Sequence, residues 1–154
     1  MRRNKFAALA CACLAVCLCA CSSAAPAGTR HRVAIVAKST QTEFWLSVFA
    51  GAEAAATEYN IALSITGPAT EEDYETQNRM VADAVEDGAE ALVFSAIDFE
   101  NNASAIDAAA DAGVAVVAID SNVDSGAVRT YIGTDNYAAG QMAARAALDG
   151  VEGE

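Results

Sequence analysis

The chain has no cysteine beyond residue 21 and few basic residues. All five cysteines of the 154-residue sequence lie between Cys11 and Cys21, so no disulfide or thiolate framework can hold the rest of the chain together. Nine Lys and Arg residues stand against 21 Asp and Glu residues, a formal charge of −12. Nucleic acid is not expected as a partner, because a phosphate backbone requires a basic surface. Disorder is not expected either, since 54% of the residues are hydrophobic.

Groups on which most catalysts depend are scarce as well. No cysteine is left as a nucleophile, and the only histidine, His31, lies in a predicted linker, so a Ser–His triad is not expected. Lys38–Glu43 contains no glycine, which argues against a nucleotide-phosphate loop. Ser95 stands at the end of the third predicted strand, where receiver domains have a carboxylate. We therefore expect no enzymatic activity and no cofactor.

Acidic residues are common in the predicted loops, but their spacing does not indicate a metal site. The loop carboxylates are Asp98, Glu100, Asp120 and Asp124. Hard cations require closely spaced oxygen ligands, and no run of alternating Asp or Asn residues occurs. The carboxylates of residues 71–75 are explained by the positive end of a helix dipole. No metal site is expected.

The N-terminal segment has the pattern of an export signal. Basic residues at positions 2, 3 and 5 precede an apolar run of 13 residues, Phe6–Leu18. Such a run is shorter than the about 20 residues of a membrane-spanning helix and suits a signal peptide. Leu18-Cys-Ala-Cys21 resembles bacterial lipoprotein signals, which implies cleavage after residue 20 and lipid attachment at Cys21. The alternative is an ordinary secretory signal that is cut near Ala25.

Residues 21–32 are predicted to form a flexible tether after this signal. Ser22–Gly28 consists of small or turn-forming residues. Removal of residues 1–20 leaves six basic and 21 acidic groups, so the exported body has a charge of −15.

From Val33 onward, short apolar runs alternate with amphipathic stretches, which is typical of βαβ units around a parallel sheet. The predicted strands are Val33–Ala37, Ile61–Ile65, Ala91–Ser95, Val114–Ile119 and Val128–Ile132. The predicted helices are Phe44–Tyr59, a helix capped by Thr70 and ended by Gly88, Asn102–Ala112, and Tyr137–Leu148 capped by Thr134 or Asp135. The predicted fold is α/β, an open parallel sheet with helices on both faces.

The first helix carries two adjacent aromatic residues, Phe44 and Trp45. Its apolar stripe is predicted at positions 44, 48, 52, 55 and 59. Adjacent side chains point about 100° apart on a helix, so only one of the two rings can face the sheet. The other ring is free to stack on a sugar ring, while Asp120 accepts hydrogen bonds from hydroxyls. Alternatively, both rings pack under the opening loop.

Ligands of open parallel sheets bind beyond the carboxyl ends of the strands, and the motifs there resemble a known family. These motifs are VAIVAKSTQTEFW at 33–45, Gly51-Ala, VVAID at 116–120 and IGTDN at 132–136. Together they resemble the type I periplasmic sugar-binding proteins of ABC importers, in particular the ribose-binding group. The resemblance implies two α/β lobes that are joined by hinge crossovers and close on a sugar.

The resemblance also implies which residues contact the sugar. The implied contacts are Lys38, Thr42, Phe44, Trp45, Ser95 and Asp120. Ribose binders have an arginine after the carboxylate, whereas this chain has Ser121, which we also predict to contact the ligand. We hypothesise that Lys38 supplies the missing cation.

The end of the chain resembles the start of a second lobe. Gly133, Thr134, Asp135 and Asn136 match the first hinge crossover. The predicted organisation is a signal peptide at 1–20, a tether at 21–32, an N-terminal lobe at 33–135, and the first helix of a truncated second lobe at 136–154. A chain truncated in this way is expected not to clamp sugar with full affinity.

The predicted protein is therefore a monomeric, extracytoplasmic lipoprotein that captures a sugar or polyol and delivers it to an ABC importer permease. It would contact the membrane only through its lipid anchor. A ligand sensor for a chemoreceptor or sensor kinase remains an alternative. A related sugar-responsive repressor would need a DNA-binding headpiece where this chain has an export signal. An exported hydrolase would need a nucleophile and base, which these 154 residues do not offer, so this alternative stays open only through the second lobe that the resemblance implies.

Overall fold

A computed structural model describes residues 29–152 of the chain. The predicted signal peptide, the predicted lipid attachment at Cys21 and most of the predicted tether lie outside the described residues.

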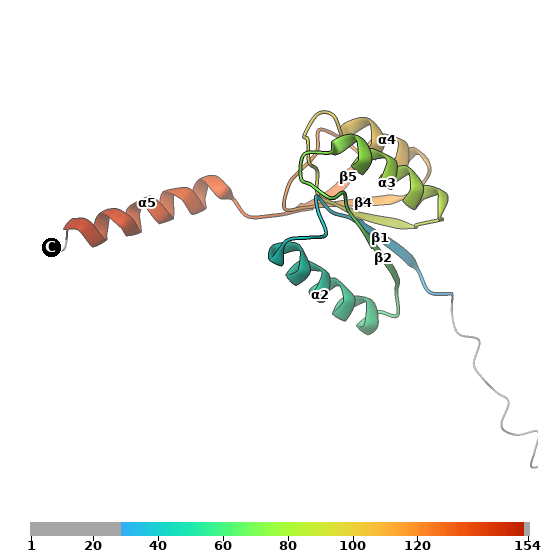
Figure 1. Cartoon of the computed structure of the whole chain (residues 1–154), viewed down its shortest axis with the longest axis horizontal. Helices are drawn as coiled ribbons and strands as arrows, with labels where there is room; N and C mark the ends of the chain where they lie inside the picture. The colour runs from blue at the N-terminus through green and yellow to red at the C-terminus, as the bar shows by residue number, and fades with distance from the viewer. Residues whose placement is uncertain (1–28, 153–154) are drawn as a thin grey trace, which may run out of the picture. The chain divides into compact units, whose positions relative to one another are not determined.

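The described residues contain one five-stranded sheet (Figure 1). Its strands are β1 (Arg32–Val36), β2 (Ala62–Thr66), β3 (Ala91–Phe94), β4 (Ala115–Ile119) and β5 (Val128–Ile132). The order is β2-β1-β3-β4-β5, and every neighbouring pair is parallel. All carboxyl ends therefore lie at one edge of the sheet. The bounds of the five strands agree with the predictions to within one residue.

Helices cover both faces of the sheet, as predicted (Figure 1). The helices are α2 (Glu43–Glu58), α3 (Tyr74–Glu86), α4 (Ala103–Asp111) and α5 (Asn136–Glu152). α2 lies on one face, and α3 and α4 lie on the other. This arrangement confirms the α/β prediction.

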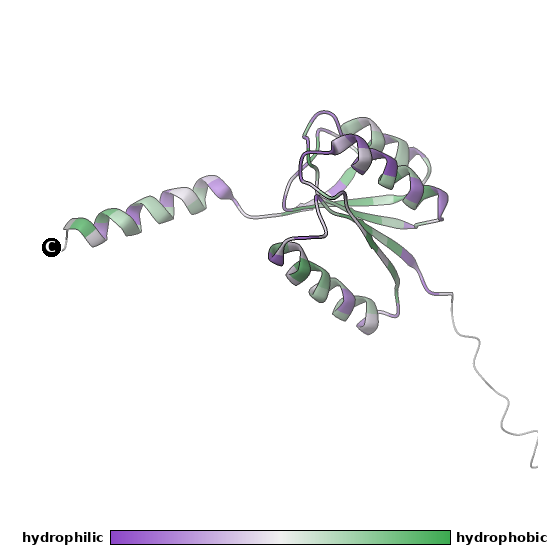
Figure 2. Cartoon of the chain, viewed as in Figure 1, coloured by the Kyte–Doolittle hydropathy of each residue, from purple (hydrophilic) through white to green (hydrophobic). Residues whose placement is uncertain are grey.

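Successive side chains of a strand point to opposite faces of the sheet, and they contribute to two hydrophobic cores, one on each face. The core under α3 and α4 contains Ala34, Val36, Leu92, Phe94, Val116, Val81 and Ile106. The core under α2 contains Ile35, Ala37, Trp45 and Phe49. Figure 2 shows the three central strands, β1, β3 and β4, as mainly hydrophobic, as expected for strands that are covered on both faces.

The buried face of α2 differs from the predicted stripe. Phe44 and Tyr59 are exposed, by 56% and 68%, whereas Trp45 and Phe49 are buried. The helix is therefore rotated by about one residue relative to the prediction. The larger indole of Trp45 fills the core, and its N–H donates to Glu71 Oε1 at 3.0 Å. Glu71 thus has a tertiary role besides the predicted favourable position near a helix N-terminus.

The start of α3 is also corrected. The N-cap is Asp73 rather than Thr70, because the Asp73 side chain accepts a hydrogen bond from the Thr76 N–H at 2.9 Å. The predicted stops hold, since Gly88 and Gly113 adopt positive φ angles of 79° and 91° directly after α3 and α4.

The last helix is longer than predicted. Asp135 accepts a hydrogen bond from the Ala138 N–H at 2.9 Å, so Asp135 rather than Thr134 caps α5. α5 continues to Glu152 instead of ending at Leu148, because Gly150 weakens a helix without ending it. Its large apolar side chains, Tyr137, Met142, Leu148 and Val151, are all exposed. Within residues 29–152, none of the helices has the length and apolar character to cross a membrane.

Candidate functional site

Four of the predicted contact residues meet at the carboxyl edge of the sheet. Lys38 follows β1, Ser95 follows β3, and Asp120 and Ser121 follow β4. Lys38 Nζ lies 3.1 Å from Asp120 Oδ2. The Ser95 and Ser121 hydroxyls lie 3.3 and 3.2 Å from the same oxygen. We call these four residues the Asp120 cluster.

The two carboxylate oxygens of Asp120 differ in their surroundings. Lys38, Ser95 and Ser121 all approach Oδ2. Within residues 29–152, no hydrogen bond reaches Oδ1 of Asp120. The Asp120 side chain is 39% exposed and that of Lys38 is 19% exposed, so the ion pair is accessible from solvent. The cluster therefore presents a fixed carboxylate with a free acceptor oxygen.

Gln77, which the sequence analysis did not select, supports the backbone beneath this cluster. Its side chain is fully buried and donates from Nε2 to Ala37 O at 2.9 Å and to Ser95 O at 2.8 Å. Its Oε1 accepts from the Ile97 N–H at 3.1 Å. One amide thereby joins the segments that follow β1 and β3. The sequence contains one signal for this role. Gln77 is a polar residue on the apolar stripe of α3, three residues after Tyr74 and four before Val81.

The two adjacent aromatic rings have separate roles. Trp45, predicted as a sugar contact, is only 1% exposed and belongs to the core. Phe44 is the exposed ring, and it packs edge-on against Trp45 with 5.1 Å between the ring centroids. Of the two, Phe44 is the one that can offer a ring face to a ligand.

Thr42 and the predicted hinge residues lie at helix starts. Thr42 is exposed and caps α2 by accepting from the Trp45 N–H at 3.4 Å. Residues 133–135 connect β5 to α5, and Asn136 is the first residue of α5. All four hinge residues are exposed. Their position is compatible with a hinge, which remains a prediction.

The loop carboxylate Asp98 has a structural explanation. Its Oδ1 accepts from the backbone N–H groups of Asn101 and Glu100 at 2.8 and 3.0 Å. These hydrogen bonds, those of Asn101 first, hold the pKa of Asp98 below its ordinary value. Within the described residues, no group of three or more His, Cys, Asp or Glu side chains could hold a metal ion.

His31 is exposed, as predicted for a linker histidine, but it has a partner. Its Nδ1 lies 2.7 Å from Glu90 Oε2, and the Arg32 N–H donates to Glu90 Oε1 at 3.2 Å. The hydrogen bond with His31, followed by that with Arg32, lowers the pKa of Glu90. This contact joins the start of β1 to the residue before β3. It therefore lies at the amino ends of the strands, whereas the Asp120 cluster lies at their carboxyl ends.

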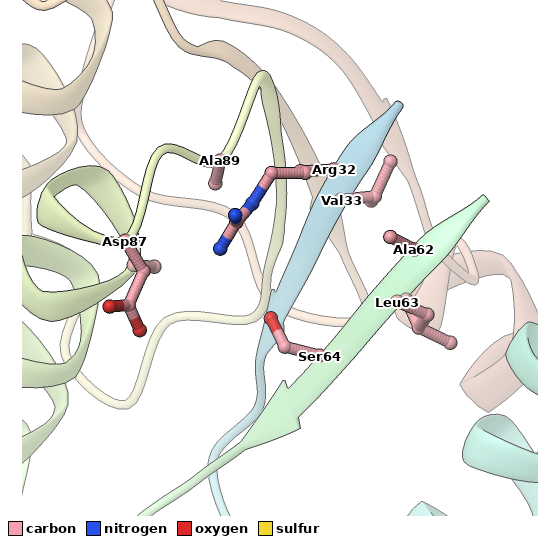
Figure 3. A pocket seen from close by; sticks show the side chains of 8 residues that line it. Arg32, Val33, Ala62, Leu63, Ser64, Asp87 and Ala89 are labelled. Atoms are coloured by element: carbon pink, nitrogen blue, oxygen red, sulfur yellow. The ribbon is translucent and has the colours of Figure 1, made fainter. Parts of the chain in front are cut away.

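A separate hollow of about 200 Å³ opens where β1 and β2 begin (Figure 3). Arg32, Ser64 and Asp87 supply its polar side chains. Figure 3 shows the Arg32 side chain extending toward Asp87. The hollow is lined by the first residues of these strands, whereas ligands of parallel sheets bind beyond their last residues. The Asp120 cluster is therefore the stronger candidate.

Residues 33–154 match a protein family described as the periplasmic binding protein domain. The chain is 31% identical over 101 residues to the ribose import binding protein RbsB of Bacillus subtilis. It is 33% identical over 113 residues to the D-ribose/D-allose-binding protein of Pseudomonas aeruginosa. These matches cover 66% and 68% of this chain but 32% and 35% of the relatives. The chain thus spans about a third of the length of the curated relatives that it matches.

Solved structures of similar fold include solute-binding proteins of sugar transporters. A carbohydrate transporter solute-binding protein from Agrobacterium radiobacter, in complex with D-arabinose, matches with a TM-score of 0.75 and 29% identity. The match covers 82% of this chain and 44% of that one. A chain of the XylFII-LytSN complex matches with a TM-score of 0.68 and 28% identity, over 79% of this chain and 44% of that one.

Proposed function

The chain belongs to the periplasmic binding protein domain family, and from this premise we propose that it is the sugar-binding component of an ABC importer. Its ligand would be a sugar or related polyol. The relatives named for ribose and allose and the arabinose complex support this ligand class. The family is one of solute-binding proteins, so the proposed activity is capture and delivery without an enzymatic step.

The observation that carries the proposal is the free oxygen of Asp120. A sugar hydroxyl is a donor as well as an acceptor, and a carboxylate accepts such a hydrogen bond more strongly than a neutral group does. Because Lys38, Ser95 and Ser121 occupy Oδ2, the carboxylate is held in one orientation. Oδ1 is then available to receive a hydroxyl without first losing a protein partner.

We further propose that Lys38 replaces the arginine that ribose binders have after the carboxylate. Its ammonium group lies 3.1 Å from Asp120 Oδ2, on the same side of the sheet edge as Ser95 and Ser121. An ammonium group has three donors, so Lys38 retains donors for a sugar oxygen after pairing with Asp120. Phe44 would supply an apolar surface for the C–H face of the ring.

Binding of D-ribose, D-arabinose and D-allose to the full chain tests this site. We expect these sugars to shift the amide resonances of the Asp120 cluster in ¹H–¹⁵N spectra. Asp120→Asn and Lys38→Ala should reduce the apparent affinity at least about tenfold, because a hydrogen bond to a charged group contributes about 1.5–3 kcal/mol. Asp124→Asn is the matched control, since Asp124 is an exposed carboxylate that follows the same strand. Unchanged binding in Asp120→Asn, or shifts confined to the Arg32 hollow, would contradict the proposal.

The remaining proposals concern the whole protein. We propose a monomeric, lipid-anchored, extracytoplasmic protein with Cys21 as the attachment point and an importer permease as its partner. We also propose that residues 33–135 form the N-terminal lobe and that 136–154 begin a second one. The partial coverage of the relatives supports this division.

A ligand-sensing role is the second candidate. It is favoured by the similarity to a chain that was solved as part of the XylFII-LytSN complex. Genes for a permease and an ATPase beside this one would support import. A neighbouring receptor or kinase gene without them would support sensing.

A further inference from the structure

Asp120 has an unusual backbone conformation that β5 supports from two sides. Its φ angle is +57°, in the left-handed region that residues with a Cβ rarely adopt. The Asp120 N–H donates to Ile132 O at 3.0 Å, and the Tyr131 hydroxyl donates to Asp120 O at 2.6 Å. Adjacent residues of β5 therefore hold both backbone polar groups of the residue that carries the free carboxylate oxygen.

The Tyr131 ring can reach Asp120 only because residue 133 is glycine. A Cβ at position 133 would overlap Oη and Cζ of Tyr131. The φ angle of Gly133 lies outside the left-handed region, so its backbone conformation does not itself require glycine. The space taken by the ring is therefore what excludes a side chain there. Gly133 is also the first residue of the predicted hinge.

We propose that Tyr131 is a positioning residue that couples the segment at 133–136 to the carboxylate of Asp120. Movement of Gly133 displaces the ring that rests on it, and the ring's hydroxyl is bonded to the Asp120 carbonyl. Rotation of the Asp120 peptide then redirects its carboxylate. The ligand part of this inference rests on the proposed sugar-binding function, whereas the structural coupling does not.

The hydroxyl bond is tested in the free full chain with Tyr131→Phe, and Tyr137→Phe is the matched control on an exposed ring. We expect amide exchange at Asp120 to become about fivefold faster, the loss expected for one net hydrogen bond. The Asp120 and Ser121 amide resonances should shift, and the melting temperature should fall by about a few degrees relative to the control. An unchanged Asp120 signal would overturn the proposal.

The contact with the hinge is tested with Gly133→Ala, and Gly126→Ala is the control because a Cβ at 126 meets nothing within 4 Å. Gly133→Ala should move the same resonances as Tyr131→Phe. In a Tyr131→Ala background, where no ring remains, Gly133→Ala should leave these resonances unchanged. If Gly133→Ala moves the Asp120 signal equally without the ring, the coupling does not pass through Tyr131.

Titration with D-ribose and D-arabinose completes the test. Tyr131→Phe should reduce the apparent affinity for these sugars, measured from the sugar-induced shifts, several-fold relative to Tyr137→Phe. Equal sugar binding in these two variants would remove Tyr131 from the control of Asp120 in binding. If the unmodified chain binds neither sugar, the proposed function fails at these ligands, and the free-chain measurements still decide the coupling.

Discussion

At the scale of single residues, Gln77 shows how a buried polar group can fix the geometry of a site. It makes its hydrogen bonds with backbone groups of Ala37, Ser95 and Ile97, which belong to two different strand ends. Those backbone segments carry Lys38 and Ser95 to the Asp120 cluster. The side chain is buried and its polar atoms are paired, so its hydrogen bonds offset the cost of removing it from water. The paired amide can therefore make the site more rigid.

Gln77→Ala should therefore destabilise the protein by about 2–4 kcal/mol, because buried backbone groups lose their partners and a cavity forms. Urea unfolding at neutral pH measures this loss. Gln41→Ala is the matched control, since Gln41 is exposed, and we expect a change within about 0.5 kcal/mol. Equal free energies of unfolding of the two variants would show that the hydrogen bonds of Gln77 make no net contribution to stability.

Strand position alone predicted which of the candidate residues lie together at the carboxyl edge of the sheet. Lys38, Ser95, Asp120 and Ser121 come directly after apolar strands, so parallel pairing brings them to one edge. It did not predict Gln77, the Trp45 bond to Glu71, or the Tyr131 bond to Asp120. These contacts join residues that are distant in sequence or depend on side-chain rotamers, which spacing does not encode.

At the scale of elements, the helix ends were predicted where a special backbone conformation is required. Gly88 and Gly113 were identified as stops because a left-handed residue after a helix favours glycine. The caps of α3 and α5 were less clear, because several candidate residues precede each helix. The rotation of α2 was predicted wrongly, because a stripe through Phe44 and one through Trp45 are both apolar.

The corrected cap of α3 leads to a pH-dependent prediction. Hydrogen bonds from the side chain and backbone of Thr76 lower the pKa of Asp73 from its ordinary value of 3.8. A carboxylate with a lowered folded-state pKa stabilises the protein above the ordinary value. This stabilisation is lost as the pH falls through the folded-state value.

Asp73→Ala should thus lower the melting temperature by about a few degrees at pH 7, and the difference should shrink as the pH falls below 3.8. Thermal unfolding followed by circular dichroism across this range measures the effect. Asp83→Ala, an exposed residue within α3, is the control. A difference between Asp73→Ala and the parent protein that is independent of pH would contradict the cap assignment.

At the scale of the whole molecule, the parallel sheet and its two helical layers were predictable because apolar runs and amphipathic stretches alternate strictly. The packing partner of the helix that follows the sheet, α5, was not predictable in this way. The apolar side chains of α5 are exposed, so nothing within residues 29–152 accounts for their hydrophobicity. The resemblance supplies the interpretation that we propose, namely that α5 begins a second lobe.

The proposed division into two lobes leads to a prediction for affinity, because one lobe alone offers only part of a clamp. In a two-lobe binder, closure stabilises the complex through contacts that both lobes make with the ligand. A dissociation constant of about 1 µM corresponds to about −8.2 kcal/mol, and half of that free energy corresponds to about 1 mM. We therefore expect these 154 residues to bind D-ribose or D-arabinose with a dissociation constant near 1 mM, measured by titration in ¹H–¹⁵N spectra. Any continuation of the same reading frame into a second α/β lobe should tighten it by orders of magnitude, whereas low-micromolar binding by the 154 residues alone would mean that the Asp120 edge is already a complete site.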